Sequence, residues 1–130
     1  MTKTIHRLPH RDAQLRVHLY PERDCVRIAP VGELDIATVG KLEETLHELH
    51  EAGFARIVVD LRDLEFLGSA GLRLLVMEHD LARRGGHEFA LIAGPPPVQR
   101  VLELCGLRDQ LNFVLERAPR RSLRNRRSRA

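Results

Sequence analysis

Two short apolar runs, residues 57–59 and 89–93, constrain the fold more than any other feature of the sequence. Both are apolar at successive positions, so neither face of the strand that each predicts is suited to water, which is the pattern of buried strands in parallel sheets. A helical pattern with apolar residues three and four positions apart lies between them. The sequence therefore predicts an α/β domain in which residues 57–59 form a central strand covered by helices on either side.

The other elements follow from periodicity and from turn residues. Residues 15–19 and 26–28 alternate apolar and polar side chains around a turn that contains Pro21, which predicts an antiparallel hairpin with one face in water. A short last strand is expected at residues 112–114. The predicted order is β-β-α-β-α-β-α-β, a small mixed β-sheet with helices packed on it. Three helices are expected, over residues 37–53, 69–86 and 95–106.

Charge is distributed unevenly along the 130 residues. Residues 116–130 contain seven arginines and one glutamate, a net charge of +6, whereas residues 1–115 contain 14 basic and 17 acidic residues, a net charge of −3. We expect a flexible segment at 1–13, one folded domain at 14–115 and a disordered basic tail at 116–130. Two roles are open for the tail: a solubilising extension, or weak binding of nucleic acid or an anionic surface through phosphate groups.

Cysteine usage and hydropathy bear on the compartment. Cys25 and Cys105 are the two cysteines, and no Cys-x-x-Cys pair occurs, so both are expected to be reduced and buried. No run of eighteen apolar residues and no apolar segment typical of a signal peptide is present in the sequence. A cytoplasmic protein without a transmembrane segment is therefore expected.

Ser69 is the candidate functional residue, because the preceding residues lead from the central strand to the start of a helix. As an N-cap, its hydroxyl would accept a backbone N–H, and its removal would cost about 1 kcal/mol. As a phosphoryl acceptor, it would be left unshielded by Gly68, Ala70 and Gly71, which let another protein approach. The amides and dipole of a helix N-terminus stabilise phosphate, so phosphorylation would add a charge of about −1.5 to −2 without refolding the domain.

Residues 66–72, Phe-Leu-Gly-Ser-Ala-Gly-Leu, resemble the signature of STAS domains, specifically of bacterial anti-sigma factor antagonists. Residues 32–35, Gly-Glu-Leu-Asp, resemble the first conserved block of that family, and the resemblance extends roughly from residue 15 to residue 114. It implies a partner surface formed by the loop after residue 32 and the start of the Ser69 helix. The residues concerned are Gly32, Glu33, Asp35, Thr38, Gly68, Ala70, Gly71 and Leu72.

The resemblance also implies a regulatory cycle. In the family, the serine that matches Ser69 is phosphorylated by an anti-sigma factor that is also an ATP-dependent serine kinase. The unphosphorylated antagonist binds this kinase and frees a sigma factor, and a PP2C-type phosphatase restores the unphosphorylated form. Asp35 matches a residue that supports recognition by the kinase. The resemblance implies no cofactor.

One departure from the family leaves an alternative open. Many members have an aspartate directly before the serine, whereas this chain has Gly68, so recognition by the kinase is expected to differ. The alternative is a STAS module that docks constitutively without phosphorylation, as a scaffold in a stress-signalling complex or as a subunit of a lipid-transport complex.

Catalytic and metal sites lack complete residue sets in the sequence. Ser69 and Gly71 match half of the G-x-S-x-G nucleophile elbow, but Leu67 stands where the first glycine is needed. Of the seven histidines, His47 and His50 are expected near the solvent side of a helix, and none has partners at ligand spacing. The sequence therefore predicts a non-enzymatic protein with no catalytic residues and no metal ligands.

Overall fold

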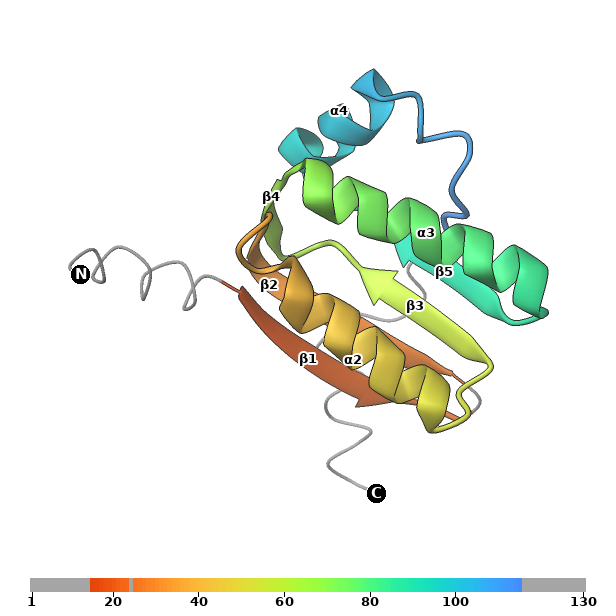
Figure 1. Cartoon of the computed structure of the whole chain (residues 1–130). Coiled ribbons are helices and arrows are strands. Elements are labelled where there is room, and N and C mark those ends of the chain that lie inside the picture. Colours follow the sequence, from red (N-terminus) through yellow and green to blue (C-terminus); the bar gives the residue numbers. More distant parts are fainter. Residues whose placement is uncertain (1–14, 24, 116–130) are drawn as a thin grey trace.

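The computed structural model describes residues 15–23 and 25–115, and the expected flexible segment at 1–13 and basic tail at 116–130 lie outside the described residues. A five-stranded sheet has the order β1-β2-β3-β5, and β4 pairs with β2 beside this path (Figure 1). The β1–β2 pair is antiparallel and the other pairs are parallel, so the predicted mixed α/β fold is confirmed. The elements are β1 (Leu15–Pro21), β2 (Val26–Leu34), α2 (Val39–Glu51), β3 (Arg56–Asp60), β4 (Leu64–Leu67), α3 (Ser69–Gly85), β5 (Glu88–Ile92) and α4 (Pro96–Leu104).

The predicted hairpin is formed by β1 and β2, with Leu15 opposite Gly32 and Pro21 opposite Val26. The solvent-exposed face that the alternation predicts is found on β1, where Arg16 and His18 are exposed. It is not found on β2, whose residues 26–30 are all buried. The difference arises because β2 has strands on both sides, whereas β1 lies at the edge of the sheet.

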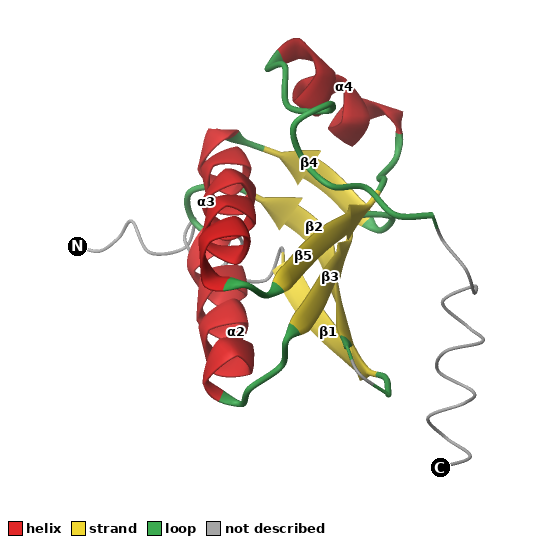
Figure 2. Ribbon diagram, turned by 90° about the vertical axis from the view of Figure 1, so that its right-hand side faces the viewer, coloured by secondary structure: helices red, strands yellow, loops and turns green. Residues whose placement is uncertain are grey.

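Strand β3 lies between β2 and β5, which confirms the predicted central position. The helices are arranged differently from the prediction, because α2 and α3 cover the same face of the sheet (Figure 2). Ile57 and Val59 are buried in one core with leucines of both helices, including Leu46 and Leu75. Helix α4 packs on β4 at one end of the sheet.

Strand β4 was missing from the predicted order, which the structure corrects to β-β-α-β-β-α-β-α. It has only four residues, and its two middle residues are both exposed, so neither an alternating nor a continuous apolar pattern marks it. The strand expected at residues 112–114 is reduced to a single bridge between Leu91 and Phe113.

The helices bury the apolar stripes that their periodicity indicates, with Leu42, Leu46 and Leu49 buried on α2. Both cysteines are free thiols, but the expectation that they are buried is wrong. Cys25 is half-buried beside the hairpin turn, and Cys105 is exposed because it follows the last turn of α4. Within the described residues, no helix has the length and apolar content to cross a membrane.

Candidate partner-binding site at the start of helix α3

The two sequence motifs meet where strands β2 and β4 end. These strands run parallel, with Leu34 opposite Leu67, and the Gly68 N–H donates a hydrogen bond to the Leu34 carbonyl at 2.9 Å. The loop at residues 35–38 therefore follows β2 at the same edge of the sheet where Ser69 follows β4. This arrangement makes one continuous surface from two segments about thirty residues apart.

Ser69 is the first residue of α3 and not its N-cap, so the interpretation of its hydroxyl as a cap is wrong. The N-cap is Gly68, whose backbone is extended and whose carbonyl accepts the Leu72 N–H at 3.0 Å. The Ser69 side chain is exposed and has no hydrogen bond to any residue that the structure describes. Its hydroxyl therefore lies at the surface in the first turn of a 17-residue helix.

Two exposed apolar side chains that sequence reasoning did not assign to the site lie on the same segments. Phe66 on β4 is 49% exposed, and Ile36 in the loop after β2 is 85% exposed. A Cβ atom added to Gly68 would lie 3.1 Å from Cε2 of Phe66, so the aromatic ring packs beside the backbone of residue 68. Isolated exposed apolar residues carry no sequence signal, and only the pairing of β2 with β4 places the segments that hold them at the same end of the sheet.

The loop after β2 is held by hydrogen bonds among its own residues. Oδ1 of Asp35 accepts the N–H groups of Ala37 at 2.9 Å and Thr38 at 3.2 Å. The Thr38 hydroxyl donates to the Glu33 carbonyl at 2.7 Å and accepts the Asp35 N–H at 3.0 Å. Thr38 is only 1% exposed, so its side chain holds the loop backbone from the interior and is not presented to a partner.

The role of Asp35 in the loop can be tested by two substitutions. We expect Asp35→Ala to lower the free energy of unfolding by about 1 kcal/mol, because the Ala37 N–H loses its acceptor and the Thr38 N–H keeps only the backbone carbonyl of residue 35 at 3.1 Å. Asp35→Asn keeps an acceptor oxygen at the same place and should cost clearly less. Urea denaturation of both variants checks the prediction, and equal losses would show that the carboxylate charge, not its acceptor geometry, stabilises the loop.

The predicted partner residues on α3 differ in exposure. Gly71 is buried, and a Cβ atom there would lie 2.8 Å from Cδ2 of Leu34 and from Cδ1 of Leu67. Its lack of a side chain lets α3 approach the ends of β2 and β4 closely. Ala70 and Leu72 are half-buried, as are Gly32, Glu33, Asp35 and Gly68.

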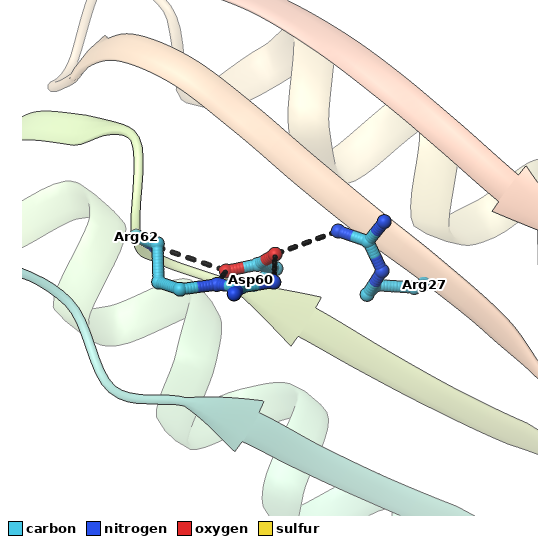
Figure 3. A network of polar contacts seen from close by, with 3 residues as sticks. All are labelled: Arg27, Asp60 and Arg62. Atoms are coloured by element: carbon cyan, nitrogen blue, oxygen red, sulfur yellow. Dashed lines mark hydrogen bonds and ion pairs between the residues drawn. The ribbon is translucent and has the colours of Figure 1, made fainter. Parts of the chain in front are cut away.

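A buried charge network fixes the connection that leads from β3 to β4 (Figure 3). Asp60 is 1% exposed, and its Oδ2 accepts hydrogen bonds from Nη1 of Arg27 at 2.6 Å and from Nη2 of Arg62 at 2.7 Å. Its Oδ1 accepts the backbone N–H of Arg62 at 3.0 Å and Nε of Arg62 at 2.9 Å. Arg27 also stacks on the Tyr20 ring, with its guanidinium carbon 4.2 Å from the ring centroid. Sequence reasoning missed this network, whose members lie on three separate segments.

The pKa of Asp60 is set by opposing effects. Burial disfavours the carboxylate and would by itself raise the pKa. The side-chain and backbone hydrogen bonds from Arg62, together with the charges of Arg62 and Arg27, outweigh burial and hold the pKa below its ordinary value. Asp60 is therefore a carboxylate at neutral pH and links β2 to the β3–β4 connection.

Of the two histidines expected near the solvent side of α2, one is exposed and the other is partly covered. His47 is exposed as predicted, but His50 is half-buried, and its Nε2 lies 2.9 Å from Oε1 of Glu78 on α3. The prediction failed for His50 because α3 packs along that side of α2. Within the described residues, no group of three or more His, Cys, Asp or Glu side chains is arranged to hold a metal ion.

Comparison with known proteins is consistent with this geometry. The STAS domain family model matches residues 18–118. The anti-sigma-B factor antagonist of Staphylococcus aureus strain NCTC 8325 is 31% identical over 81 residues, which cover 62% of this chain and 75% of that protein. The anti-sigma F factor antagonist of Paenibacillus polymyxa is 29% identical over 94 residues, which cover 72% of this chain and 80% of that protein.

Solved structures agree with the sequence relatives. An anti-sigma factor antagonist from Mycobacterium paratuberculosis superposes with a TM-score of 0.69 and 25% identity, covering 87% of this chain and 94% of that one. Unphosphorylated SpoIIAA shares the fold at a TM-score of 0.66 and 20% identity, covering 88% and 98% of the two chains. The chain belongs to the STAS domain family, among the bacterial anti-sigma factor antagonists, as the resemblance in its sequence had indicated.

Proposed function

We propose that the chain is an anti-sigma factor antagonist controlled by phosphorylation at Ser69. In its unphosphorylated form it binds an anti-sigma factor that is also a serine kinase, and thereby releases a sigma factor. The partner would dock over the loop at residues 32–38 and the first turn of α3. The observation that carries this proposal is the exposed Ser69 hydroxyl, which has no hydrogen bond within the described residues and lies beside that loop.

Phosphorylation would act at this surface by charge and by bulk. The phosphate would stand at the N-terminus of α3, where backbone amides and the helix dipole stabilise an anion, so the fold would be retained. It would add a charge of about −1.5 to −2 to a surface that already carries Glu33, Asp35 and Glu65. The phosphorylated surface would then repel a partner that is complementary to the unphosphorylated surface. A PP2C-type phosphatase would remove the phosphate and restore binding.

In this role the protein is a binding partner rather than an enzyme. The kinase and the phosphatase supply the chemistry, and Ser69 supplies the acceptor oxygen. The protein would work in the cytoplasm, where sigma factors act on RNA polymerase.

A second candidate function is constitutive docking without phosphorylation. Gly68 leaves no carboxylate directly before Ser69, and a side chain at position 68 would begin only 3.1 Å from Cε2 of the Phe66 ring. Together with Ile36, this ring gives the surface an apolar character that could serve binding in either function. The two candidates differ in whether Ser69 ever carries a phosphate.

The test begins with peptide mass spectrometry on the protein purified from its native cells, to detect phosphate on Ser69. Ser69→Ala and Ser69→Asp variants are then titrated by calorimetry against anti-sigma factors that carry a serine-kinase domain in the same genome. We expect Ser69→Ala to bind at least as tightly as the wild type, and Ser69→Asp to bind more weakly by about tenfold or more. Equal binding by the two variants would exclude the switch, and tight equal binding without phosphate in cells would favour constitutive docking.

A further inference from the structure

Arg73 lies one helical turn after Ser69 on α3. Residues four apart on a helix are neighbours, with Cβ atoms about 5–6 Å apart. The Arg73 side chain is exposed and has no ion-pair or hydrogen-bond partner among the residues that the structure describes. The other arginines of the helix differ, since Arg84 pairs with Asp80 at 2.9 Å and Arg83 approaches the same carboxylate at 3.9 Å.

We propose that Arg73 binds the phosphate of phosphorylated Ser69 and thereby stabilises the modified state. This inference rests on the proposed function, because it concerns the phosphate that the function places on Ser69. An anion at position i and a cation at i+4 is the favourable order along a helix, because it also agrees with the helix dipole. Guanidinium groups form charge-assisted hydrogen bonds with phosphate oxygens, so Arg73 can reach across the turn and pair with the group.

The pair would give the modification a second effect. In the unphosphorylated protein, Arg73 is a cation exposed beside Ser69 and available to an acidic group of the partner. In the phosphorylated protein, the same guanidinium would be neutralised by the phosphate, so the partner would meet an added anion and also lose a cation. One chemical event would therefore change two features of the docking surface.

The other charged groups around this end of the sheet do not replace Arg73. Strands β2 and β4 and the loop that follows β2 contribute acidic side chains, which would raise the phosphate's second pKa. The ammonium group of Lys41 on α2 donates to the Leu15 carbonyl at 2.8 Å. Helix α4, which packs on β4, contributes one exposed charge of each sign. The groups are Glu33, Asp35, Glu65, Lys41, Arg100 and Glu103.

The experiment measures the second pKa of the phosphate by 31P NMR in protein with phosphoserine incorporated at position 69 during synthesis. The unsubstituted chain is compared with Arg73→Gln, with Arg73→Lys, and with Arg83→Gln as a control for the loss of one charge. We expect the phosphate pKa in Arg73→Gln to be higher by about 0.2–0.4, because the dianion loses its cation. Arg73→Lys should retain most of the effect.

The control separates a local pair from general charge. Residue 83 lies roughly 20 Å along the helix from residue 69, beyond the Debye length at physiological ionic strength of about 8 Å, so Arg83→Gln should leave the phosphate pKa unchanged. Equal pKa values in all four proteins would overturn the proposal. Because phosphoserine is incorporated without a kinase, this result is independent of whether cells phosphorylate Ser69, which the mass spectrometry above decides.

Discussion

Replacement of Asp60 by alanine is expected to lower the free energy of unfolding by about 3–5 kcal/mol. The side chain of Arg27 is 5% exposed, and Asp60 is the acceptor of its Nη1. Nε and Nη2 of Arg27 are buried and already lack hydrogen-bond partners, so the variant would leave an entire buried guanidinium without a counter-charge. Urea denaturation followed by circular dichroism measures the loss.

A surface ion pair on the same sheet provides the control. Nε of Arg56 on β3 lies 3.0 Å from Oε1 of Glu88 on β5, and both side chains are largely exposed. Arg56→Gln breaks this pair and is expected to cost less than about 1 kcal/mol, because water screens exposed charges. A similar small loss in Asp60→Ala would contradict the assignment of Asp60 as the residue that compensates Arg27.

The acid dependence of stability gives a second measurement on the same variant. The folded-state pKa of Asp60 lies below the unfolded value of about 3.9, so its ionisation contributes stability that is fully present above that pH. This contribution is lost as the pH falls from about 4 towards the folded-state pKa. The difference in stability between the wild type and Asp60→Ala should therefore narrow below pH about 4 and stay constant from pH 5 to 7.

The sequence predicts those parts of the fold that have a local cause. The apolar run at residues 57–59 indicates a buried strand, and β3 is found at the centre of the sheet. Helix ends marked by glycine are found as expected, with Gly86 in the left-handed conformation that favours this residue. Strand β4 has no such local cause, because it is defined by pairing with β2 and keeps Glu65 and Phe66 exposed.

The sequence predicted that the two motifs lie close together, but not the structural positions that their residues take. The two motifs do meet, because β2 and β4 end side by side. Thr38 and Gly71 are buried, however, and Ser69 begins the helix after its cap. These positions depend on how α3 packs against Leu34 and on which residue takes the extended cap conformation. Both are set by contacts between segments far apart in the chain, which periodicity does not report.

The packing of α3 leads to the second large expected effect, in the variant Gly71→Val. Its Cβ would lie 2.8 Å from Cγ and Cδ2 of Leu34 and from Cδ1 of Leu67. Real Cβ contacts are not this short, so the helix or both leucines must move, and such overpacking costs about 1–3 kcal/mol. Thermal and urea denaturation measure the loss of stability.

Gly40→Val is the matched control, because Gly40 is also a helical glycine and a Cβ there would meet nothing within 4 Å. We expect its stability to change by less than about 0.5 kcal/mol, since valine is slightly better than glycine in a helix. If Gly71→Val were as stable as Gly40→Val, the close approach of α3 to β2 and β4 would not be required. If it is destabilised as expected, the start of α3 or the side chains of Leu34 and Leu67 have moved, and either movement changes how α3 packs beside the loop at residues 35–38. Gly71→Val should then weaken partner binding even though Ser69 is intact, because the loop and the first turn of α3 would no longer hold the relative positions that the partner contacts.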